Sequence, residues 1–423
     1  MGSDAVSKSA FKSAVLALGL LLAGVFCATG AQAAGRGLVW TGAWTSAQLA
    51  PDAQSDLNPA DLKDATVREI VHLSLGGPRL RIRLSNVFGS TPLHVAAAHV
   101  ARALAPAGGA IAPGTDRVLT FAGAAEATIP PGAEYWSDPV DLAAPSLSDL
   151  AVSLYFDAPP DRLTWHQGSH ATSYLLAGDK TAAPDAQGAR RFEHWVQLSG
   201  VDVAARPGAF AIVAFGDSIT DGHGSTTDGN NRWPDVLAAR LQAAGPTRKI
   251  GVLNEGIGGN RVLRDSFGPN AMARLDRDVL AQSGVRDVIV MEGINDIGVL
   301  TRAAPASAEA HAQLVRRLEE GYEQIILKAH AHGLRVIGGA MTPFMGSDYY
   351  HPDAANEADR QEVNAWIRTS GRFDAVVDFD HAVRDPAHPE RLRADYDSGD
   401  HLHPSPAGYR AMARAVSTAV IAP

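Results

Sequence analysis

The chain has 423 residues, of which 46% are hydrophobic and 20% charged, and its formal net charge is -9. This length can bury a large core and form more than one domain. The acidic balance argues against nucleic acid as a partner, because phosphate binding needs a basic face. A single cysteine, Cys27, excludes an internal disulfide and a site built from several thiolates.

The N-terminus has the pattern of a secretory signal peptide. Lys8 and Lys12 precede an apolar run over residues 14–26, and Ala-Gln-Ala at 31–33 supplies small residues for cleavage. We therefore predict a signal peptide at 1–33 and a secreted or periplasmic protein. The apolar run is too short to span a bilayer, and we expect no membrane span in the mature chain.

Residues 34–205 have a β-like pattern and are predicted to form a β-sandwich or jelly-roll module. Short strand candidates alternate with turns rich in glycine and proline, which is typical of such modules. The strands expected are 80–84, 154–156 and 195–198. The segment 103–115 is expected to be a loop, and helix is expected only near 61–68.

The pattern changes near residue 206, where apolar strands begin to alternate with amphipathic helices. This order predicts a parallel sheet between two layers of helices, so 206–423 is expected to form a three-layer α/β/α domain. The strands expected are 211–215, 250–254, 287–291, 335–339 and 375–379. The helices expected are 233–244, 271–282, 307–332, 357–370 and 406–421.

The first of these strands ends abruptly at a small hydroxyl residue. Residues 211–222 read Ala-Ile-Val-Ala-Phe-Gly-Asp-Ser-Ile-Thr-Asp-Gly, and the apolar start is typical of a strand buried on both faces. Open α/β sheets place their ligands at the carboxyl ends of strands, which makes Ser218 a candidate nucleophile. Taken alone, Asp217 and Ser218 could equally cap the next helix.

Two later segments carry candidate donors to the same edge of the predicted sheet. The loop 256–259 is rich in glycine, which lets backbone N–H groups approach a ligand, and Gly259 is the favoured donor. Asn295 follows the strand 287–291, and its amide could donate to a developing oxyanion. A local turn contact is the alternative role for this asparagine.

A third segment, Asp400-His-Leu-His403, supplies a base. A serine hydroxyl needs a base to take its proton, and that base needs a partner that fixes its tautomer. Asp400 and His403 can form this pair on one loop. His401 is a competing base, but it follows Asp400 directly, which makes a side-chain pairing harder.

These four segments together resemble the SGNH hydrolase superfamily, also called GDSL-type esterases. Residues 216–222 resemble its first block, Gly259 its second, 293–296 its third and 400–403 its last, over roughly residues 209–423. The resemblance implies a flavodoxin-like α/β/α fold and a carboxylic ester hydrolase. It implies Ser218 as nucleophile, His403 as general base and acid, and Asp400 as its orienting partner. It also implies an oxyanion hole formed by Ser218, Gly259 and Asn295.

The N-terminal module resembles a xylan-esterase-like branch of this superfamily, in which a β module precedes the hydrolase domain. The residues that carry this resemblance are 44–47 and 81–89 in the module and 232–235 in the hydrolase domain. This resemblance implies short-chain or acetyl esters on carbohydrate. A lipase or aryl esterase acting on lipids or small molecules is an alternative. A sugar O-acyltransferase and a non-catalytic carbohydrate-binding protein are further alternatives.

Two tyrosines, Tyr349 and Tyr350, follow another predicted strand end and are candidates for a wall of the substrate pocket. His166 and His170, with Trp165, could reach over the cleft, although a role in the core or at the surface is favoured. No cofactor is expected, because this mechanism needs none, and no metal-binding motif is evident. The expected partner is a small-molecule or polysaccharide ester, and the sequence carries no signal for oligomeric state.

Overall fold

The structure is a computed structural model that describes residues 37–51 and 55–421. The predicted signal peptide at 1–33 lies outside these residues. From Val39 onward the chain packs as one unit. Among the described residues, no helix has both the length and the apolar character needed to cross a membrane.

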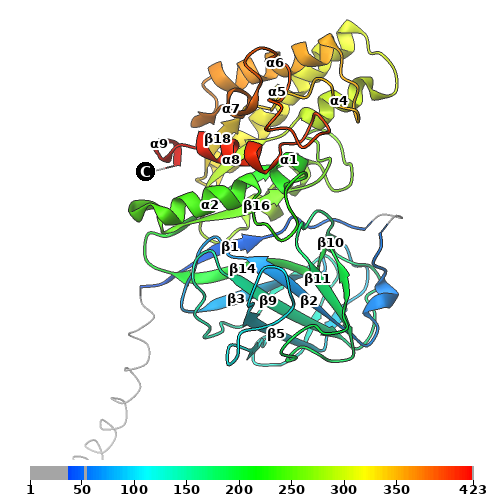
Figure 1. The fold of residues 1–423 in the computed structure, drawn as a ribbon, viewed down its shortest axis with the longest axis vertical. Coiled ribbons are helices and arrows are strands. Elements are labelled where there is room, and N and C mark those ends of the chain that lie inside the picture. Colours follow the sequence, from blue (N-terminus) through cyan, green and yellow to red (C-terminus); the bar gives the residue numbers. More distant parts are fainter. Residues whose placement is uncertain (1–36, 52–54, 422–423) are drawn as a thin grey trace, which may run out of the picture. The chain divides into compact units, whose positions relative to one another are not determined.

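The first half of the unit is antiparallel, as predicted, and we call Val39–Ala205 the β region (Figure 1). One sheet has the strand order β1 (Val39–Thr45), β14 (Leu198–Ala205), β3 (Leu80–Ser85) and β8 (Glu134–Trp136). The other has the order β12 (Arg190–Phe192), β11 (Ser173–Ala177), β2 (Ala65–His72), β9 (Asp149–Phe156), β5 (Ala97–Arg102) and β6 (Arg117–Val118). Apolar residues of both sheets, among them Ile82 and Val152, share one buried cluster.

Two short pairs complete the β region. β10 (Trp165–His166) pairs with β13 (Trp195–Val196), and β4 (Leu93–Val95) pairs with β7 (Ala127–Ile129). The segment 103–115 contains no helix or strand, as expected.

The helix expected near 61–68 is wrong. A short 3-10 turn, η1 (Pro59–Leu62), is followed at once by β2, which pairs with β9 and β11 on its two sides. Arg68 and Glu69 are charged residues within an apolar run, a pattern that is also typical of an amphipathic helix. Both side chains are fully buried here, and Arg68 donates to backbone carbonyl oxygens such as that of Gly109, at 2.7 Å.

The second half of the unit, Phe210–Ile421, is the predicted α/β fold, and we call it the α/β region. Its parallel sheet has the order β16 (Ile250–Gly256), β15 (Phe210–Gly216), β17 (Val285–Met291), β18 (Arg335–Gly339) and β19 (Ala375–Val377). The chain starts in the second strand of this order and adds strands on both sides. This arrangement creates a switch point between neighbouring strands where open sheets bind ligands.

The helices form two groups. α2 (Trp233–Ala243), α7 (Phe379–Val383) and α8 (Pro406–Ala415) pack together, and α5 (Ala308–Ala331) packs with α3 (Ala271–Leu275) and α6 (Ala354–Thr369). Right-handed crossovers in this strand order place the two groups on opposite faces of the sheet. The two shortest helices are α1 (Ser218–Asp221) and α9 (Thr418–Ile421).

Some predicted boundaries differ from the structure. The last strand ends at Val377 rather than 379, because Asp378 accepts from the backbone N–H of His381 and caps α7. The helix expected over 271–282 continues after α3 as a π-helical turn, η3 (Asp276–Leu280). The helix expected over 406–421 is interrupted near Val416, between α8 and α9. α4 (Ile294–Arg302) was not predicted.

The β region lies against β16, the edge strand of the parallel sheet (Figure 1). Ser74 Oγ accepts from the N–H of Val252 at 2.9 Å and donates to the carbonyl oxygen of Ala43 at 2.7 Å. A Cβ on Gly251 would lie only 2.5 Å from the carbonyl oxygen of Gly42. The two regions therefore meet backbone to backbone at a point where only glycine fits.

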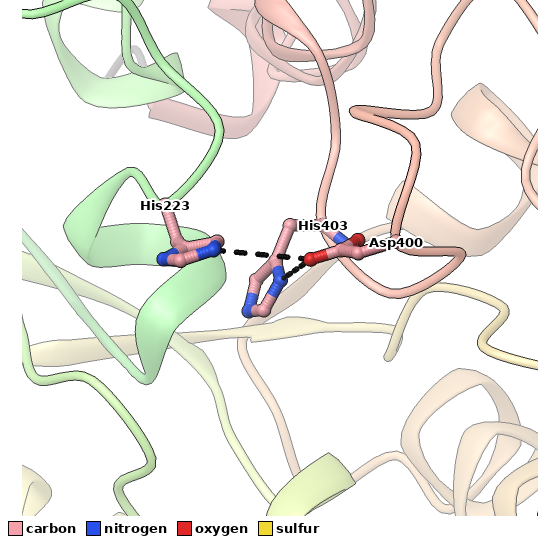
Figure 2. Close-up of side chains that lie close together, drawn as sticks. All are labelled: His223, Asp400 and His403. Atoms are coloured by element: carbon pink, nitrogen blue, oxygen red, sulfur yellow. Dashed lines mark hydrogen bonds and ion pairs between the residues drawn. The ribbon is translucent and has the colours of Figure 1, made fainter. Parts of the chain in front are cut away.

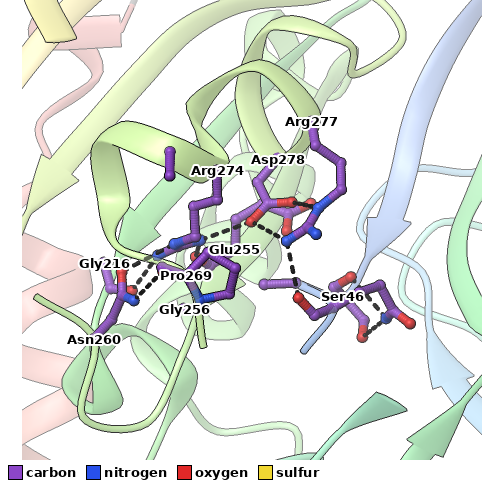
Figure 3. Close-up of polar contacts among 12 residues, drawn as sticks. Ser46, Gly216, Glu255, Gly256, Asn260, Pro269, Arg274, Arg277 and Asp278 are labelled. Atoms are coloured by element: carbon purple, nitrogen blue, oxygen red, sulfur yellow. Dashed lines mark hydrogen bonds and ion pairs between the residues drawn. The ribbon is translucent and has the colours of Figure 1, made fainter. Parts of the chain in front are cut away.

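A buried guanidinium joins the loops at the carboxyl edge of the sheet (Figure 3). Arg274 donates to the carbonyl oxygens of Gly216 at 2.9 Å and Glu255 at 2.7 Å, which are at the ends of β15 and β16. It also donates to Asn260 Oδ1 at 2.9 Å and pairs with Asp278 at 3.0 Å. Because its side chain is fully buried, every one of these contacts replaces water.

We expect Arg274→Met to destabilise the protein strongly, by about 3–5 kcal/mol, because it leaves a buried carboxylate and several buried acceptors without their cation. Urea unfolding followed by fluorescence measures the change. Arg316→Met is the matched control, since Arg316 is exposed on α5 and its loss should cost under about 0.5 kcal/mol. Equal unfolding free energies for the two variants would contradict this prediction.

Candidate active site

Ser218 lies at the first turn after β15, where the chain turns sharply from strand into α1. Asp217 caps this short helix by accepting from the N–H of Ile219 at 2.9 Å. Gly216 allows the turn, because a Cβ there would lie 2.2 Å from Thr220 Oγ1 and 2.7 Å from a backbone oxygen. Both readings of this stretch therefore hold: Asp217 is the cap, and Ser218 is presented at the carboxyl edge of the sheet.

A chain of hydrogen bonds links Ser218, His403 and Asp400. The Oγ of Ser218 lies 2.8 Å from Nε2 of His403. Nδ1 of His403 lies 2.5 Å from Oδ2 of Asp400, and Figure 2 shows this second contact. A carboxylate only accepts, so Nδ1 carries a proton and Nε2 is free to accept from the serine. This is the tautomer that a general base needs.

Asp400 is held as a carboxylate. Burial acts to raise its pKa, but the hydrogen bond and charge of His403 and the backbone N–H groups of His403 and Leu402 outweigh burial and lower the pKa. Its Oδ1 accepts those N–H groups at 2.8 and 3.0 Å. An ionised Asp400 can stabilise the imidazolium that forms when His403 takes a proton.

The competing base, His401, is placed elsewhere. Its Nδ1 lies 2.6 Å from Asp397 Oδ2, and its side chain is 53% exposed. It makes no contact with Ser218 among the described hydrogen bonds. The geometry therefore favours His403.

The predicted oxyanion donors line the same cavity as Ser218. Gly259 has a φ of 66°, which favours glycine, and a Cβ there would lie 2.8 Å from the exposed ring of Phe267, which would have to shift. Asn295 is buried at the first turn of α4, where Nδ2 donates to the carbonyl oxygen of Asn260 at 2.7 Å. One N–H of this amide remains for a ligand.

Tyr350 fixes the other end of that amide. Its hydroxyl donates to Asn295 Oδ1 at 2.6 Å, and it is almost fully buried against Gly298, where a Cβ would lie 2.5 Å from the ring. Because Oδ1 of Asn295 already accepts from Tyr350, the group that this amide has left for a ligand is an N–H and not the oxygen. The sequence indicated Tyr350 as a pocket wall, and its contact with Asn295 was not predicted.

Asp296 has a structural role. Its carboxylate accepts the N–H of Val262 at 2.8 Å and of Leu263 at 3.2 Å, which ties α4 to the loop that carries Gly259. Burial raises the pKa of Asp296 to about 6.

A cavity of about 420 Å³ contains these groups. The α/β region contributes Ser218, Asp221, His223, Ile257, Gly258, Gly259, Phe267, Asn295, Tyr349, Tyr350, Asp400, Leu402 and His403 to its lining. The β region contributes Leu49, Gln167, Gly168 and His170. The structure therefore places every predicted site residue at one cavity, and one of its walls comes from the β region.

His223 was not among the predicted site residues. Its ring centroid lies 4.1 Å from that of His403, and its Nε2 lies 3.8 Å from Asp400 Oδ2 (Figure 2). Burial lowers the pKa of His223, and the nearby His403 lowers it further. A signal was present in the sequence, since His223 comes directly after the first block, but a lone histidine in a loop gave no reason to select it.

The same three side chains could also approach a metal ion. One ligand atom from each of His223, Asp400 and His403 lies within 4.8 Å of the others. However, Nδ1 of His403 already bonds Asp400, and Nε2 already bonds Ser218. The hydrogen-bond chain therefore uses the two ring nitrogens that a metal would need.

His166 and Asp221 connect the β region to α1. Nε2 of His166 lies 2.8 Å from Asp221 Oδ1, and Nδ1 lies 2.7 Å from the carbonyl oxygen of Ala47. Both neighbours are acceptors, so the ring carries both protons and forms a buried ion pair with Asp221. Burial opposes this charge, but Asp221 outweighs burial and raises the pKa of His166. The favoured core role for His166 fits this position.

A serine, histidine and aspartate joined in this order at the carboxyl edge of a parallel sheet define a serine hydrolase. Residues 214–411 match the model of the GDSL-like lipase/acylhydrolase family. The chain thus carries a GDSL-like lipase/acylhydrolase domain and is a carboxylic ester hydrolase, as the four sequence blocks indicated. A comparison with curated proteins found no match.

Solved structures similar to this chain include three enzymes. A GDSL-like lipase from Bacteroides thetaiotaomicron has 18% sequence identity and a TM-score of 0.36, and the match covers 50% of this chain and 87% of that one. An acetylxylan esterase from Geobacillus stearothermophilus has 25% identity and a TM-score of 0.38, and the match covers 50% of this chain and 94% of that one. A lipase/acylhydrolase from Enterococcus faecalis has 20% identity and a TM-score of 0.34, and the match covers 49% of this chain and 93% of that one. The acetylxylan esterase was solved as a catalytic mutant.

Asp217, which caps the helix that carries Ser218, makes the stability of the protein depend on pH. Burial raises the pKa of Asp217 from 3.8 to about 7, so the folded protein holds a proton that the unfolded chain releases. This contribution to stability is full below about pH 4 and is lost as pH rises to about 7, by at most about 1.4 kcal/mol per pH unit.

We expect Asp217→Asn to flatten the fall in stability between about pH 4 and 7, because the amide cannot ionise and can still accept the N–H of Ile219. Urea midpoints measured across this pH range test it. Glu320→Gln, at an exposed position on α5, is the control and should keep the wild-type slope. A wild-type slope in Asp217→Asn would show that this carboxyl does not titrate in the window.

Proposed function

We propose that the protein is a secreted hydrolase that removes short acyl groups, acetyl above all, from carbohydrate esters. The observation that carries the catalytic part is the hydrogen-bond chain from Ser218 through His403 to Asp400, at 2.8 and 2.5 Å, within one cavity. The substrate would be a small-molecule or polysaccharide ester. No cofactor takes part.

In the first half of the proposed reaction, Ser218 Oγ attacks the acyl carbon while Nε2 of His403 takes its proton. The carbonyl oxygen becomes an oxyanion, which accepts from the N–H groups of Ser218 and Gly259 and from the amide of Asn295. His403 then gives the proton to the alcohol oxygen, the ester C–O bond breaks and the alcohol leaves.

In the second half, water replaces the alcohol. His403 takes a proton from water, the resulting hydroxide attacks the acyl carbon of acyl-Ser218, and the Ser218 Oγ–acyl bond breaks. His403 returns the proton to Ser218, which restores the enzyme and releases the carboxylic acid. Asp400 stays ionised throughout and orients the imidazole.

The lining of the cavity supports a small, partly polar substrate. Apolar side chains such as Phe267 and Leu402 lie in the same cavity as Gln167 and His170. A volume of about 420 Å³ is at the small end of ligand sites, which suits an acetyl group and one sugar ring better than a long acyl chain. Tyr349 and Tyr350 are proposed as part of the pocket wall.

Secretion belongs to the same proposal. It is supported by the sequence at the N-terminus, where Lys8 and Lys12 precede an apolar run and a small-residue cleavage site. An ester of an extracellular polysaccharide would be within reach of a secreted enzyme.

A panel of p-nitrophenyl esters of increasing acyl length, together with acetylated xylan, tests the proposal. We expect kcat/KM to fall steeply beyond short acyl groups and acetate to be released from the polysaccharide. Ser218→Ala should lose at least about 10⁴-fold in kcat on every substrate. A preference for long acyl chains would identify a lipase instead, and full activity of Ser218→Ala would overturn the mechanism.

We expect Tyr350→Phe to lower kcat about three- to tenfold with little change in KM, because the amide of Asn295 loses one of the bonds that orient it. In an Asn295→Ala background the same change should have almost no effect on kcat. Tyr155→Phe is the control, since it removes a hydroxyl bonded to Asp64 in the β region. Equal losses with and without Asn295 would contradict a role through this amide.

A further inference from the structure

The side of the cavity that receives the alcohol can be identified from the chemistry. His403 gives its proton to the leaving oxygen, so the alcohol must lie on the His403 side of Ser218. The ring of His223 lies 4.1 Å from the ring of His403, and the ring of His170 lies 6.4 Å from the ring of His223. A row of three imidazoles therefore runs from the base toward the β region.

The loop that carries His170 is held firmly by the α/β region. Thr172 donates to Asp228 through its N–H and its hydroxyl, both at 2.7 Å, and the N–H of Asp228 donates to the carbonyl oxygen of His170 at 2.9 Å. Arg232 donates to the carbonyl oxygen of Ser169 at 3.3 Å. These contacts fix the position of His170 without using its side chain.

His170 is held in a backbone conformation that side chains rarely adopt, with a φ of 43°. Such conformations persist where the surrounding structure enforces them, and they gather at functional sites. The ring of His170 lines the cavity, and no described residue forms a hydrogen bond with it. A half-buried imidazole without a hydrogen-bond partner in the described part of the chain is available to a ligand.

The ring of His170 is neutral near pH 7. Burial lowers its pKa to about 4 against the opposing charge of Asp221, and the nearby Arg232, His223 and His166 contribute to the same lowering. A neutral imidazole has one N–H donor and one acceptor nitrogen. A sugar hydroxyl, which also donates and accepts, matches this pair of functions.

We propose that His170 is a specificity-determining residue, which hydrogen-bonds a free hydroxyl of the alcohol part of the substrate and so favours esters of polyhydroxy alcohols. This inference rests on the proposed function, because it places the alcohol by the action of His403. It assigns a part of the substrate site to the β region.

A matched pair of substrates separates this role from general catalysis. The first is a mono-O-acetyl methyl pentopyranoside, whose ring carries free hydroxyls. The second is cyclohexyl acetate, which has a ring of the same size and no hydroxyl. We expect the wild-type enzyme to favour the pyranoside in kcat/KM, and the ratio of the two values is the quantity to compare.

His170→Gly removes the ring and suits the backbone, because glycine adopts positive φ readily. It should keep or raise the melting temperature and lower the kcat/KM ratio about three- to tenfold, the effect of one neutral hydrogen bond. Ala122→Gly is the control: its φ is 52° in an exposed turn of the β region, so it relieves similar strain away from the cavity. Its ratio should stay at the wild-type value.

The outcomes distinguish the two levels of the proposal. If the wild type shows no preference for the pyranoside, both the carbohydrate substrate and the role of His170 are wrong. If the wild type prefers the pyranoside and a folded His170→Gly keeps that preference, only the role of His170 is overturned. His170→Asn, which also tolerates positive φ but has a shorter side chain, gives the same test if the glycine variant fails to fold.

Discussion

The buried cation of Arg274 organises the whole catalytic edge of the sheet. A guanidinium out of water is stable only if its donors find acceptors, and here they reach carbonyls at the ends of β15 and β16 and the side chain of Asn260. The turn before Ser218 and the loop of Gly259 are therefore fixed relative to the same planar group. Without it, two strand ends would be free to move apart by small amounts, which is enough to disturb an oxyanion hole.

The acidic side chains around Arg274 differ in the direction of their pKa shifts. Asp278 pairs with both Arg274 and Arg277, whose charges outweigh burial and lower its pKa. Burial instead raises the pKa of Glu255 and Glu292 well above the usual range. Arg277 in turn donates to the carbonyl oxygen of Gln48 at 2.8 Å, which extends the network into the β region.

The parts of the site that follow local rules could be predicted from the sequence. Ser218 follows an uninterrupted apolar strand, and Asp400 and His403 are close enough in the chain to pair. What depends on contacts between distant segments could not be predicted. The sequence allowed His170 to reach over the cleft but favoured a core or surface role, and that preference is wrong: His170 lines the cavity because Asp228 and Arg232 hold its loop. The strand at Arg68 could not be predicted for the same reason, since the burial of this side chain depends on carbonyl groups far along the chain.

The contact between β16 and the β region has a consequence for association between molecules. An edge strand with free N–H and C=O groups can pair with a strand of another chain and extend the sheet. Here the N–H of Val252 is bonded by Ser74, and Gly251 lies so close to Gly42 that no foreign backbone fits between them. Growth of the parallel sheet through β16 is therefore blocked, and the β region acts as a cap against polymerisation as well as a wall of the cavity.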